Sequence, residues 1–186
     1  MTLTSEEIFE RYVAPDACMG FTNLDERSLR QRVGDRFEIP IANVYIVGSA
    51  KIGFTLTPKK GRPVYSAFRP ESDVDVAIVS DAIFDRAWKE CLRFWHGSGY
   101  RENTGYWAER GKDFRSYHFR GWMRPDKLPS GGALTYANEW FDFFRQLVSD
   151  RVAGDSRINA GVYRERHFLE MYQRIAIDGC KARHIR

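Results

Sequence analysis

The chain has 186 residues, of which 43% are hydrophobic and 29% are charged, and its formal net charge is +4 at pH 7. This composition suits one soluble globular domain, and no apolar run approaches the roughly 18 to 20 residues that cross a bilayer, so we expect a cytoplasmic protein without a membrane partner. Cys18, Cys91 and Cys180 are widely spaced and form no CxxC pair, so neither a disulfide framework nor a zinc site is indicated.

The N-terminal part of the chain predicts helices followed by a strand. Thr4 and Glu7 fit a capping box at the start of a short helix. Apolar residues near helical spacing predict an amphipathic helix over residues 24–37. A continuous apolar run predicts a strand over residues 43–47, and a short helix is expected within residues 50–56.

The middle of the chain predicts a loop, a second strand and a third long helix. Residues 57–71 are rich in Pro, Gly, Lys and Arg, which is typical of an exposed basic loop. Alternating apolar residues predict a strand over residues 73–79, and an apolar stripe predicts a helix over residues 82–95. Residues 97–121 have no clean period, and we expect irregular or helical structure leading to a short strand over residues 117–123.

The C-terminal part predicts two helices separated by a loop. A Pro/Gly turn region over residues 124–132 precedes a strongly aromatic helix over residues 136–148. We expect a loop over residues 154–161, a final helix over residues 164–178 and a frayed basic tail over residues 181–186. The buried face of the final helix is expected to hold Phe168, Met171, Tyr172 and Ile175.

These elements predict an α/β (α+β) chain with a mixed sheet and helices packed on it. We expect a single domain over residues 1–186, with a core over about residues 40–130 and a helical C-terminal part over about residues 133–186.

The most informative stretch joins the two predicted strands. The first strand stops at Gly48-Ser49, and the second carries Asp73 and Asp75 at positions i and i+2. Side chains at this spacing project from the same face of a strand. Two carboxylates held together repel, and a divalent cation with oxygen ligands, often shared with nucleotide phosphates, relieves that repulsion. The pattern therefore predicts a metal site.

A strand entering GSAKIG, followed by SDVDVAIVS at the start of a second strand, resembles the signature of the nucleotidyltransferase superfamily that includes DNA polymerase beta. The resemblance implies a polymerase-beta-like core that binds an NTP with Mg²⁺ or Mn²⁺ and transfers the nucleotidyl group to a hydroxyl acceptor. It implies catalytic and metal-binding roles for Asp73 and Asp75. It also implies nucleotide binding by Gly48, Ser49 and Gly53. Lys51 lies inside the same turn and is either a further nucleotide-binding residue, in contact with phosphate, or a surface charge.

The sequence departs from this signature in two ways. Residues 50–72 form a longer connection than is typical, so residues 57–71 look like an insertion. Its basic side chains are candidates for phosphate or nucleic-acid contacts, and an exposed solvated loop is the alternative: Lys59, Lys60, Arg62 and Arg69. The third carboxylate of the family lies between apolar residues on a later strand, and here Asp126, ahead of Asp113, is the candidate for that metal-binding and catalytic role.

Other side chains are weaker candidates. His118 is near the predicted third strand and is either a substrate contact or a packed histidine. Arg120 and Arg124 flank Trp122 and either clamp a triphosphate or pack on aromatic rings. Aromatic residues of the helix over residues 136–148 exceed one face and are either core or a partner-protein interface: Trp140, Phe141, Phe143 and Phe144.

The leading hypothesis is a metal-dependent nucleotidyltransferase, and the resemblance suggests a compact enzyme of the toxin–antitoxin or phage-defence kind. One alternative is a nucleotide-binding subunit with an impaired site that docks a partner protein. The other alternative is a nucleic-acid-binding module that uses the basic loop.

Overall fold

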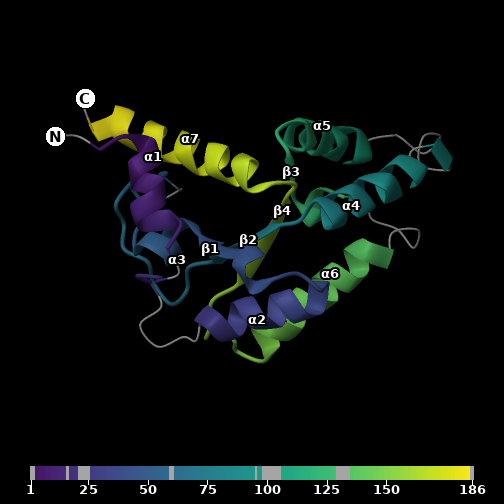
Figure 1. Cartoon of the computed structure of the whole chain (residues 1–186), viewed down its shortest axis with the longest axis horizontal. Coiled ribbons are helices and arrows are strands. Elements are labelled where there is room, and N and C mark those ends of the chain that lie inside the picture. Colours follow the sequence, from purple (N-terminus) through teal and green to yellow (C-terminus); the bar gives the residue numbers. More distant parts are fainter. Residues whose placement is uncertain are drawn as a thin grey trace.

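The computed structural model describes residues 3–15, 17–20, 26–58, 61–94, 96–97, 106–128 and 135–184. Its secondary structure alternates between helices and strands and combines them in one mixed α/β arrangement (Figure 1). The helices are α1 (Ser5–Ile8), which continues as a π-helical turn (Phe9–Val13), α2 (Glu26–Phe37), α3 (Gly48–Ile52), α4 (Asp81–Phe94), α5 (Tyr106–Phe119), α6 (Thr135–Ser149) and α7 (Arg166–His184). The strands are β1 (Val44–Val47), β2 (Val74–Val79), β3 (Trp122–Met123) and β4 (Ile158–Tyr163).

The four strands form one mixed sheet in the order β1-β2-β4-β3. β1 and β2 are antiparallel, with Val47 opposite Asp75. β2 and β4 are parallel, with Asp75 opposite Asn159. The short strand β3 is antiparallel to β4 and pairs only with its last two residues, Val162 and Tyr163. The predictions of a mixed sheet and of both strands around the Gly-Ser and Asp-x-Asp motifs are confirmed.

The loop predicted over residues 154–161 is wrong, because β4 occupies its second half. The sequence of β4 is INAGVY, in which Asn159 and Gly161 interrupt the apolar pattern. Asn and Gly are both unfavourable in strands, and together they hide the period of two by which a strand is recognised. The sheet therefore takes a central strand from the part of the chain that was expected to be helical, and its core is not confined to about residues 40–130.

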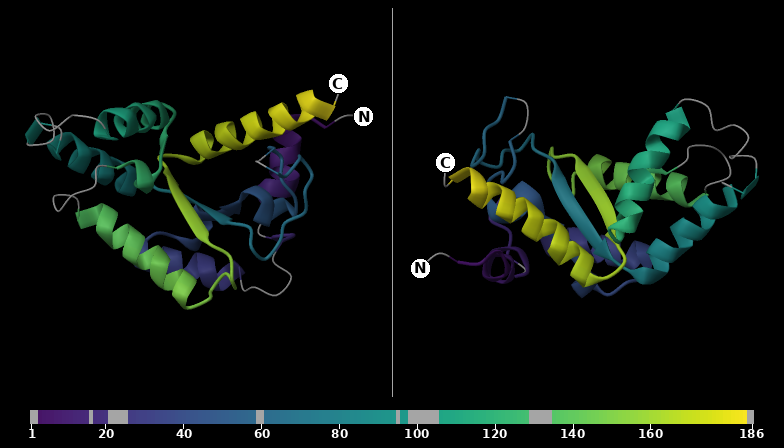
Figure 2. Two further views of the ribbon diagram at one scale, coloured as in Figure 1. Left: turned by 180° about the vertical axis from the view of Figure 1, so that it is seen from behind. Right: turned by 90° about the horizontal axis from the view of Figure 1, so that it is seen from above.

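The two faces of the sheet are covered by different helices. α2, α4 and α6 pack on one face, where Val44, Val76 and Val162 belong to the main core cluster. α7 and the N-terminal helix pack on the other face, together with Val47 and Ala77. Figure 2 shows α7 running beside β2 and β4 when the molecule is seen from above. Asp75 lies on the α7 side, because its neighbours Val74 and Val76 point into the opposite core.

The buried face predicted for α7 is wrong for three of its four residues, and only Phe168 is partly buried against the core cluster on this side of the sheet. Met171 and Ile175 are 48% and 64% exposed, and Tyr172 is 40% exposed. The helix instead buries the stripe formed by Leu169, Gln173, Ile177 and Cys180. The polar Gln173 in the middle of this stripe disguises it in the sequence.

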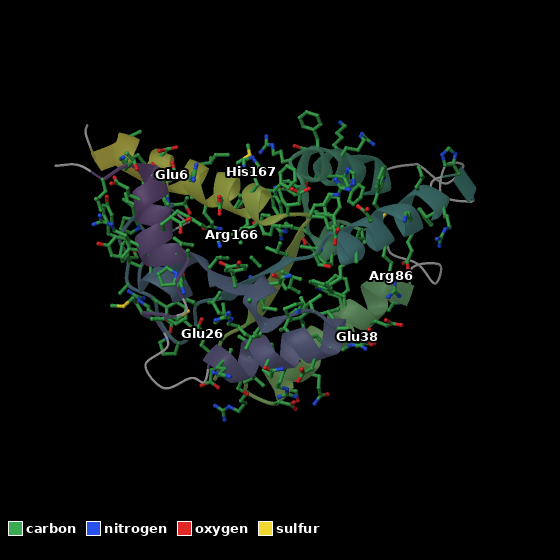
Figure 3. All side chains as sticks on the ribbon, viewed as in Figure 1. Glu6, Glu26, Glu38, Arg86, Arg166 and His167 are labelled. Atoms are coloured by element: carbon green, nitrogen blue, oxygen red, sulfur yellow. The ribbon has the colours of Figure 1, made fainter. Side chains whose placement is uncertain are left out.

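The helix α7 is also longer than predicted and is held at its far end. It extends to His184, so residues 181–184 are helical and not a frayed tail. Lys181 Nζ donates to the Leu3 carbonyl at 2.8 Å. Ion pairs join the N-terminal helix to α7, from Arg174 to Glu6 at 3.0 Å and from Arg166 to Glu10 at 3.3 Å. Figure 3 labels Glu6 on the N-terminal helix and Arg166 on α7.

All three cysteines are free. Among the helices that the structure describes, none is long and apolar enough for a membrane crossing.

Candidate functional site

A cavity of about 860 Å³ lies between the sheet and α7 and extends past β4 to α6. It contains five of the residues predicted for the site: Gly48, Ser49, Asp73, Asp75 and Asp126. They come from the start of α3, from β2 and the residue before it, and from the turn after β3. Cavities that bind small molecules usually measure about 300–1,000 Å³. This cavity is therefore large enough for a nucleotide.

Gly48 packs directly against the second carboxylate. It follows Val47, which is paired with Asp75, and its φ of +68° turns the chain out of β1 into α3. A Cβ at this position would lie 2.7 Å from Asp75 Oδ2. Glycine is thus favoured both by its backbone angle and by the space that the carboxylate occupies. The Gly-Ser turn and the Asp-x-Asp strand meet as the sequence predicts.

Asp73 and Asp75 supply negative charge to the cavity from one face of β2. Both side chains are half-buried. Burial raises the pKa of two phenols in the same region, Tyr163 and Tyr172. Neighbouring tyrosines raise both pKa values further, and so does the Asp75 carboxylate. Within the described residues, no group of three or more His, Cys, Asp or Glu side chains is arranged to hold a metal ion.

Asp126 lines the cavity but forms an ion pair there. It lies in a 3₁₀ turn (Pro125–Lys127), and its two carboxylate oxygens accept from Arg124 Nε and NH2 at 2.9 and 3.0 Å. This bidentate pair occupies the oxygens that a third metal ligand would use. Asp113, the other candidate, accepts from Lys127 Nζ at 2.8 Å and does not line the cavity. The structure thus gives each of these carboxylates a basic partner.

Asn159 is a cavity residue that the sequence analysis did not select. It is the partner of Asp75 in the β2–β4 register, so the two side chains lie side by side on the α7 face of the sheet. Neighbouring strands are about 4.7–4.9 Å apart. An amide oxygen is an accepted ligand for Mg²⁺ and Ca²⁺. In the sequence, the signal for this residue is a polar side chain between the apolar Ile158 and Ala160, and it is neutral where the family signature has an acid.

Lys51 and Gly53 do not line the cavity. Lys51 is 2% exposed, and its Nζ donates to the Pro15 carbonyl. This hydrogen bond connects α3 to the residues that follow the N-terminal helix. Gly53 ends α3 with a φ of +83°. Both residues therefore have structural explanations in this fold, in place of the nucleotide contacts that were predicted.

The predicted insertion is a loop that folds back on the residues after α3. Lys59 and Lys60 lie outside the described residues. Arg69 forms an exposed ion pair with Glu71 at 3.9 Å. Arg62 points inward and lines a second, smaller cavity of about 160 Å³ with Ser49, Thr55, Glu71, Ser72 and Asp73. Ser49, Thr55 and Asp73 line both cavities, so the two are adjoining.

Aromatic rings also line the cavity. Trp122 lies 4.8 Å from Tyr172 and 5.8 Å from Tyr163, measured between ring centroids. The Nε1 atom of Trp122 is buried and has no hydrogen-bond partner among the described residues. Phe141 is 38% exposed and also lines the cavity. These rings offer flat apolar surfaces to a bound molecule.

The remaining aromatic residues of α6 belong to the core. Trp140 and Phe144 are buried, and Phe143 is partly buried against the same cluster. Phe37 of α2 contacts this group, with its ring 4.9 Å from that of Trp140. The surplus aromatic surface predicted for this helix is thus mostly internal.

His118 does not face the cavity. Its ring lies 4.8 Å from that of Phe84, 5.0 Å from that of Trp88 and 5.7 Å from that of Phe114. Its buried Nε2 has no hydrogen-bond partner among the described residues. Burial lowers the pKa of His118, which keeps the ring neutral in this packed position.

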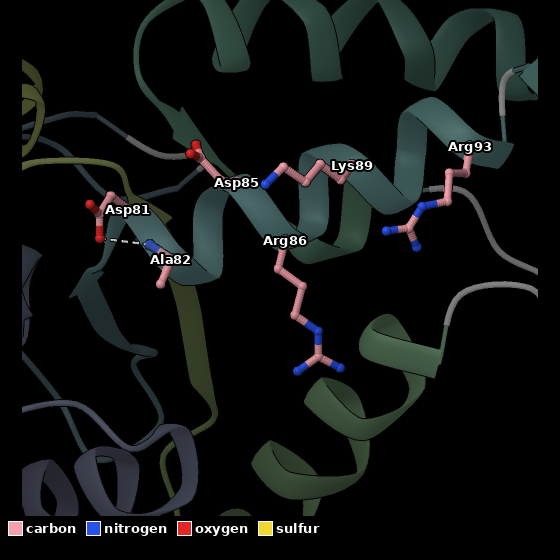
Figure 4. Close-up of a pocket in the computed structure, with 6 residues that line it drawn as sticks. All are labelled: Asp81, Ala82, Asp85, Arg86, Lys89 and Arg93. Atoms are coloured by element: carbon pink, nitrogen blue, oxygen red, sulfur yellow. Dashed lines mark hydrogen bonds between the residues drawn. The ribbon is translucent and has the colours of Figure 1, made fainter.

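A further pocket of about 450 Å³ runs along α4, away from the carboxylates of β2 (Figure 4). Its charged residues are of both signs and include Asp85 and Arg86. Asp85 accepts from Arg164 Nε at 3.2 Å, and Arg86 pairs with Glu90 at 3.4 Å. The pocket holds none of the residues predicted for the site, and Asp85 and Arg86 already have partners, so we regard it as a weaker candidate than the cavity between the sheet and α7.

Comparisons with protein-family models, with curated proteins and with solved structures found no match to this chain.

Proposed function

We propose that the chain is a metal-dependent nucleotidyltransferase that transfers a nucleotidyl group from an NTP to a hydroxyl acceptor. The observation that carries this proposal is the contact of Gly48 with Asp75. It places the Ser49 hydroxyl and the carboxylates of Asp73 and Asp75 in one cavity large enough for a nucleotide. The motifs that resemble the nucleotidyltransferase signature are thus adjacent in space.

The oxygen atoms of this cavity suit a hard divalent cation. Mg²⁺ is usually held by one or two carboxylates together with waters and substrate phosphates, so a dedicated cage of protein ligands is not required. Asp73 and Asp75 would supply the carboxylates, and Asn159 would supply an amide oxygen. Mn²⁺ accepts the same kinds of ligand. A bound cation would neutralise phosphate charge and favour ionisation of the acceptor hydroxyl.

The reaction would proceed by in-line substitution at the α-phosphorus. The acceptor oxygen forms a bond to this atom while the bond to the bridging oxygen of the β-phosphate breaks, and pyrophosphate leaves with the bonding electron pair. The acceptor proton passes to solvent. The protein's contribution is to orient the two reactants, with Ser49 on phosphate oxygens and the rings of Trp122 and Tyr172 beside the nucleobase.

A second candidate function is nucleotide binding without efficient transfer. Asn159, which lies beside Asp75, is neutral, and Asp126, the expected third acid, is held by Arg124. Both observations reduce the negative charge available to a second cation. This alternative keeps the same ligand and the same cavity, so turnover distinguishes the two.

The test is pyrophosphate release from each of the common NTPs in Mg²⁺, measured for the wild type and for Asp73→Asn/Asp75→Asn. We expect release by the wild type and its loss in the double variant, because the amides keep the shape of the site and remove its charge. Asp126→Asn is the matched control, since it neutralises a carboxylate of the same cavity that is paired with Arg124. Asn159→Asp should strengthen Mn²⁺ binding.

Three results separate the hypotheses. Loss of release in the double variant, with activity retained in Asp126→Asn, supports the enzyme. Saturable NTP binding without release from any NTP, with a panel of hydroxyl acceptors present, supports the binding protein. Release that is unchanged in Asp73→Asn/Asp75→Asn contradicts the proposed site.

A further inference from the structure

The insertion between the two motifs is fixed to the site by backbone hydrogen bonds. Thr55 N donates to the Ser66 carbonyl at 3.0 Å, and Tyr65 N donates to the Thr55 carbonyl at 2.8 Å. Phe68 N donates to the Gly53 carbonyl at 2.8 Å. The loop therefore folds back on the residues that follow α3, and its position relative to Ser49 is set by the main chain.

Within this loop, Arg62 is held in one orientation. Its NH1 donates to Ser72 Oγ at 3.0 Å, and its NH2 donates to the Ala67 carbonyl at 2.7 Å. Ser72 is buried, and its Oγ also accepts from Arg69 N at 3.2 Å. Because these bonds already restrict a long side chain, a ligand that binds the guanidinium would lose little further conformational entropy.

One donor of this guanidinium is left over. The Nε–H of Arg62 is shielded from solvent and has no hydrogen-bond partner among the described residues. An unused donor that is shielded from solvent is unfavourable, and an ordered water or a bound ion is among the partners that satisfy such a donor. An arginine offers phosphate several N–H groups in a planar arrangement that matches its oxygens.

The cavity beside Arg62 has the size and position for a phosphate group. It measures about 160 Å³, below the roughly 300–1,000 Å³ of sites that hold whole ligands. Ser49, Thr55 and Asp73 connect it to the main cavity. An anion bound here would lie between Arg62 and any cation held by Asp73, so positive charge would flank it on two sides and offset the repulsion from Asp73 and Glu71.

We propose that Arg62 binds the phosphate group at the far end of the triphosphate, and that the insertion thereby makes the site selective for nucleoside triphosphates over monophosphates. This inference rests on the proposed function, because it takes the main cavity to hold the nucleoside and α-phosphate. The same contact neutralises charge that develops on the departing pyrophosphate. The insertion is in this view a part of the site that recognises the leaving group.

The experiment measures binding by calorimetry to the full-length chain in Mg²⁺, with inorganic tripolyphosphate and with AMP as probes. Arg62→Gln should weaken tripolyphosphate binding about tenfold or more, since a hydrogen bond to a charged group is lost, and should change AMP binding less than about twofold. Arg69→Gln is the matched control: it removes an arginine of the same loop whose side chain is exposed and paired with Glu71. It should leave both affinities near wild type.

A second variant guards against a folding defect. Ser72→Ala removes the oxygen that holds Arg62 NH1 and keeps the arginine itself. It should weaken tripolyphosphate binding in the same direction as Arg62→Gln and by a smaller factor. Thermal unfolding of each variant shows whether it remains folded.

The outcomes distinguish this inference from the proposed function. Equal losses for tripolyphosphate and AMP in Arg62→Gln, or equal losses in Arg62→Gln and Arg69→Gln, would overturn the role of Arg62. Pyrophosphate release by wild type together with unchanged tripolyphosphate binding in Arg62→Gln would support the enzyme and refute this contact. Loss of tripolyphosphate binding in Arg62→Gln, in a protein that releases no pyrophosphate, would keep the phosphate site and refute the transferase.

Discussion

Position 48 has no room for a side chain larger than hydrogen. Its φ is +68°, and an added Cβ would lie 2.7 Å from Asp75 Oδ2. Position 61 has the constraint on the backbone angle without the steric one, because Gly61 has a φ of +75° and nothing lies within 4 Å of the position that a Cβ would take. The two glycines therefore allow backbone strain to be separated from displacement of the carboxylate.

We expect Gly61→Ala to lower the free energy of unfolding by about 1–2 kcal/mol, the cost of a left-handed conformation for a residue with a Cβ. Gly48→Ala should lower it by more, because the methyl group also displaces Asp75. Urea denaturation measures both changes. Mn²⁺ binding should be weakened in Gly48→Ala and unchanged in Gly61→Ala. Equal effects of the two substitutions on stability and on metal binding would show that Gly48 does not support Asp75.

The residues of the site differ in how far the sequence could predict them. Four of them can be recognised from the residues next to them in the sequence, because each lies where an apolar strand begins or ends: Gly48, Ser49, Asp73 and Asp75. Asn159 cannot be recognised in this way, since its place beside Asp75 depends on the register of two strands that are far apart in the sequence. Local pattern reveals which side chains share a face of one strand, but not which strand lies beside it.

At the scale of single elements, α7 forms both a wall of the cavity and a cover for the sheet. Leu169 is fully buried on its sheet side, whereas Ile175 is 64% exposed and lines the cavity. Replacing each by alanine deletes an aliphatic side chain of the same size and keeps a good helix former. The pair therefore compares a packing position with a position at the cavity.

Leu169→Ala should lower the free energy of unfolding by about 2–5 kcal/mol, as removal of a buried leucine does. Ile175→Ala should change it by less than about 0.5 kcal/mol, because the side chain is mainly exposed. Thermal and urea unfolding give the two values, and calorimetric titration with NTP and Mg²⁺ shows whether Ile175→Ala weakens nucleotide binding. A larger loss of stability for Ile175→Ala than for Leu169→Ala would restore the face of α7 that the apolar pattern predicted.

The elements that could be predicted share a clear period or a clear boundary. The capping box of α1 is present as expected, with Thr4 and Glu7 satisfying each other's backbone N–H groups. Among the strands, β4 was missed because Asn159 and Gly161 have low strand propensity and its stability comes from pairing with β2 on one side. Pairing with a distant strand thus determined the conformation of a segment whose own preference for strand was weak.

At the scale of the whole molecule, the last part of the chain completes the sheet that the first part begins. β4 lies between β2 and β3, so two of the three strand pairs in the sheet depend on it. The helix α7 then returns across the sheet to the N-terminal helix, and the two chain ends lie close together (Figure 1). Leu169 and Ile177 of α7 join Phe9 and Val13 in the same buried cluster. The residues that follow α6 therefore complete both the sheet and the core cluster on its α7 side.

A fragment of residues 1–150 should therefore fail to fold, although it contains both sequence motifs. Without β4, the inner edge of β2 has no partner, and without α7 the face that carries Asp75 and Ala77 loses its cover. We expect the fragment to show no cooperative urea transition, followed by tryptophan fluorescence and by circular dichroism, while the full chain shows one transition with coincident curves. Adding a peptide of residues 151–186 should restore the transition, because β4 and α7 then pair with β2 across the break. Cooperative unfolding of the fragment alone would mean that β1, β2 and their helices form an independent core, as the sequence pattern by itself suggested.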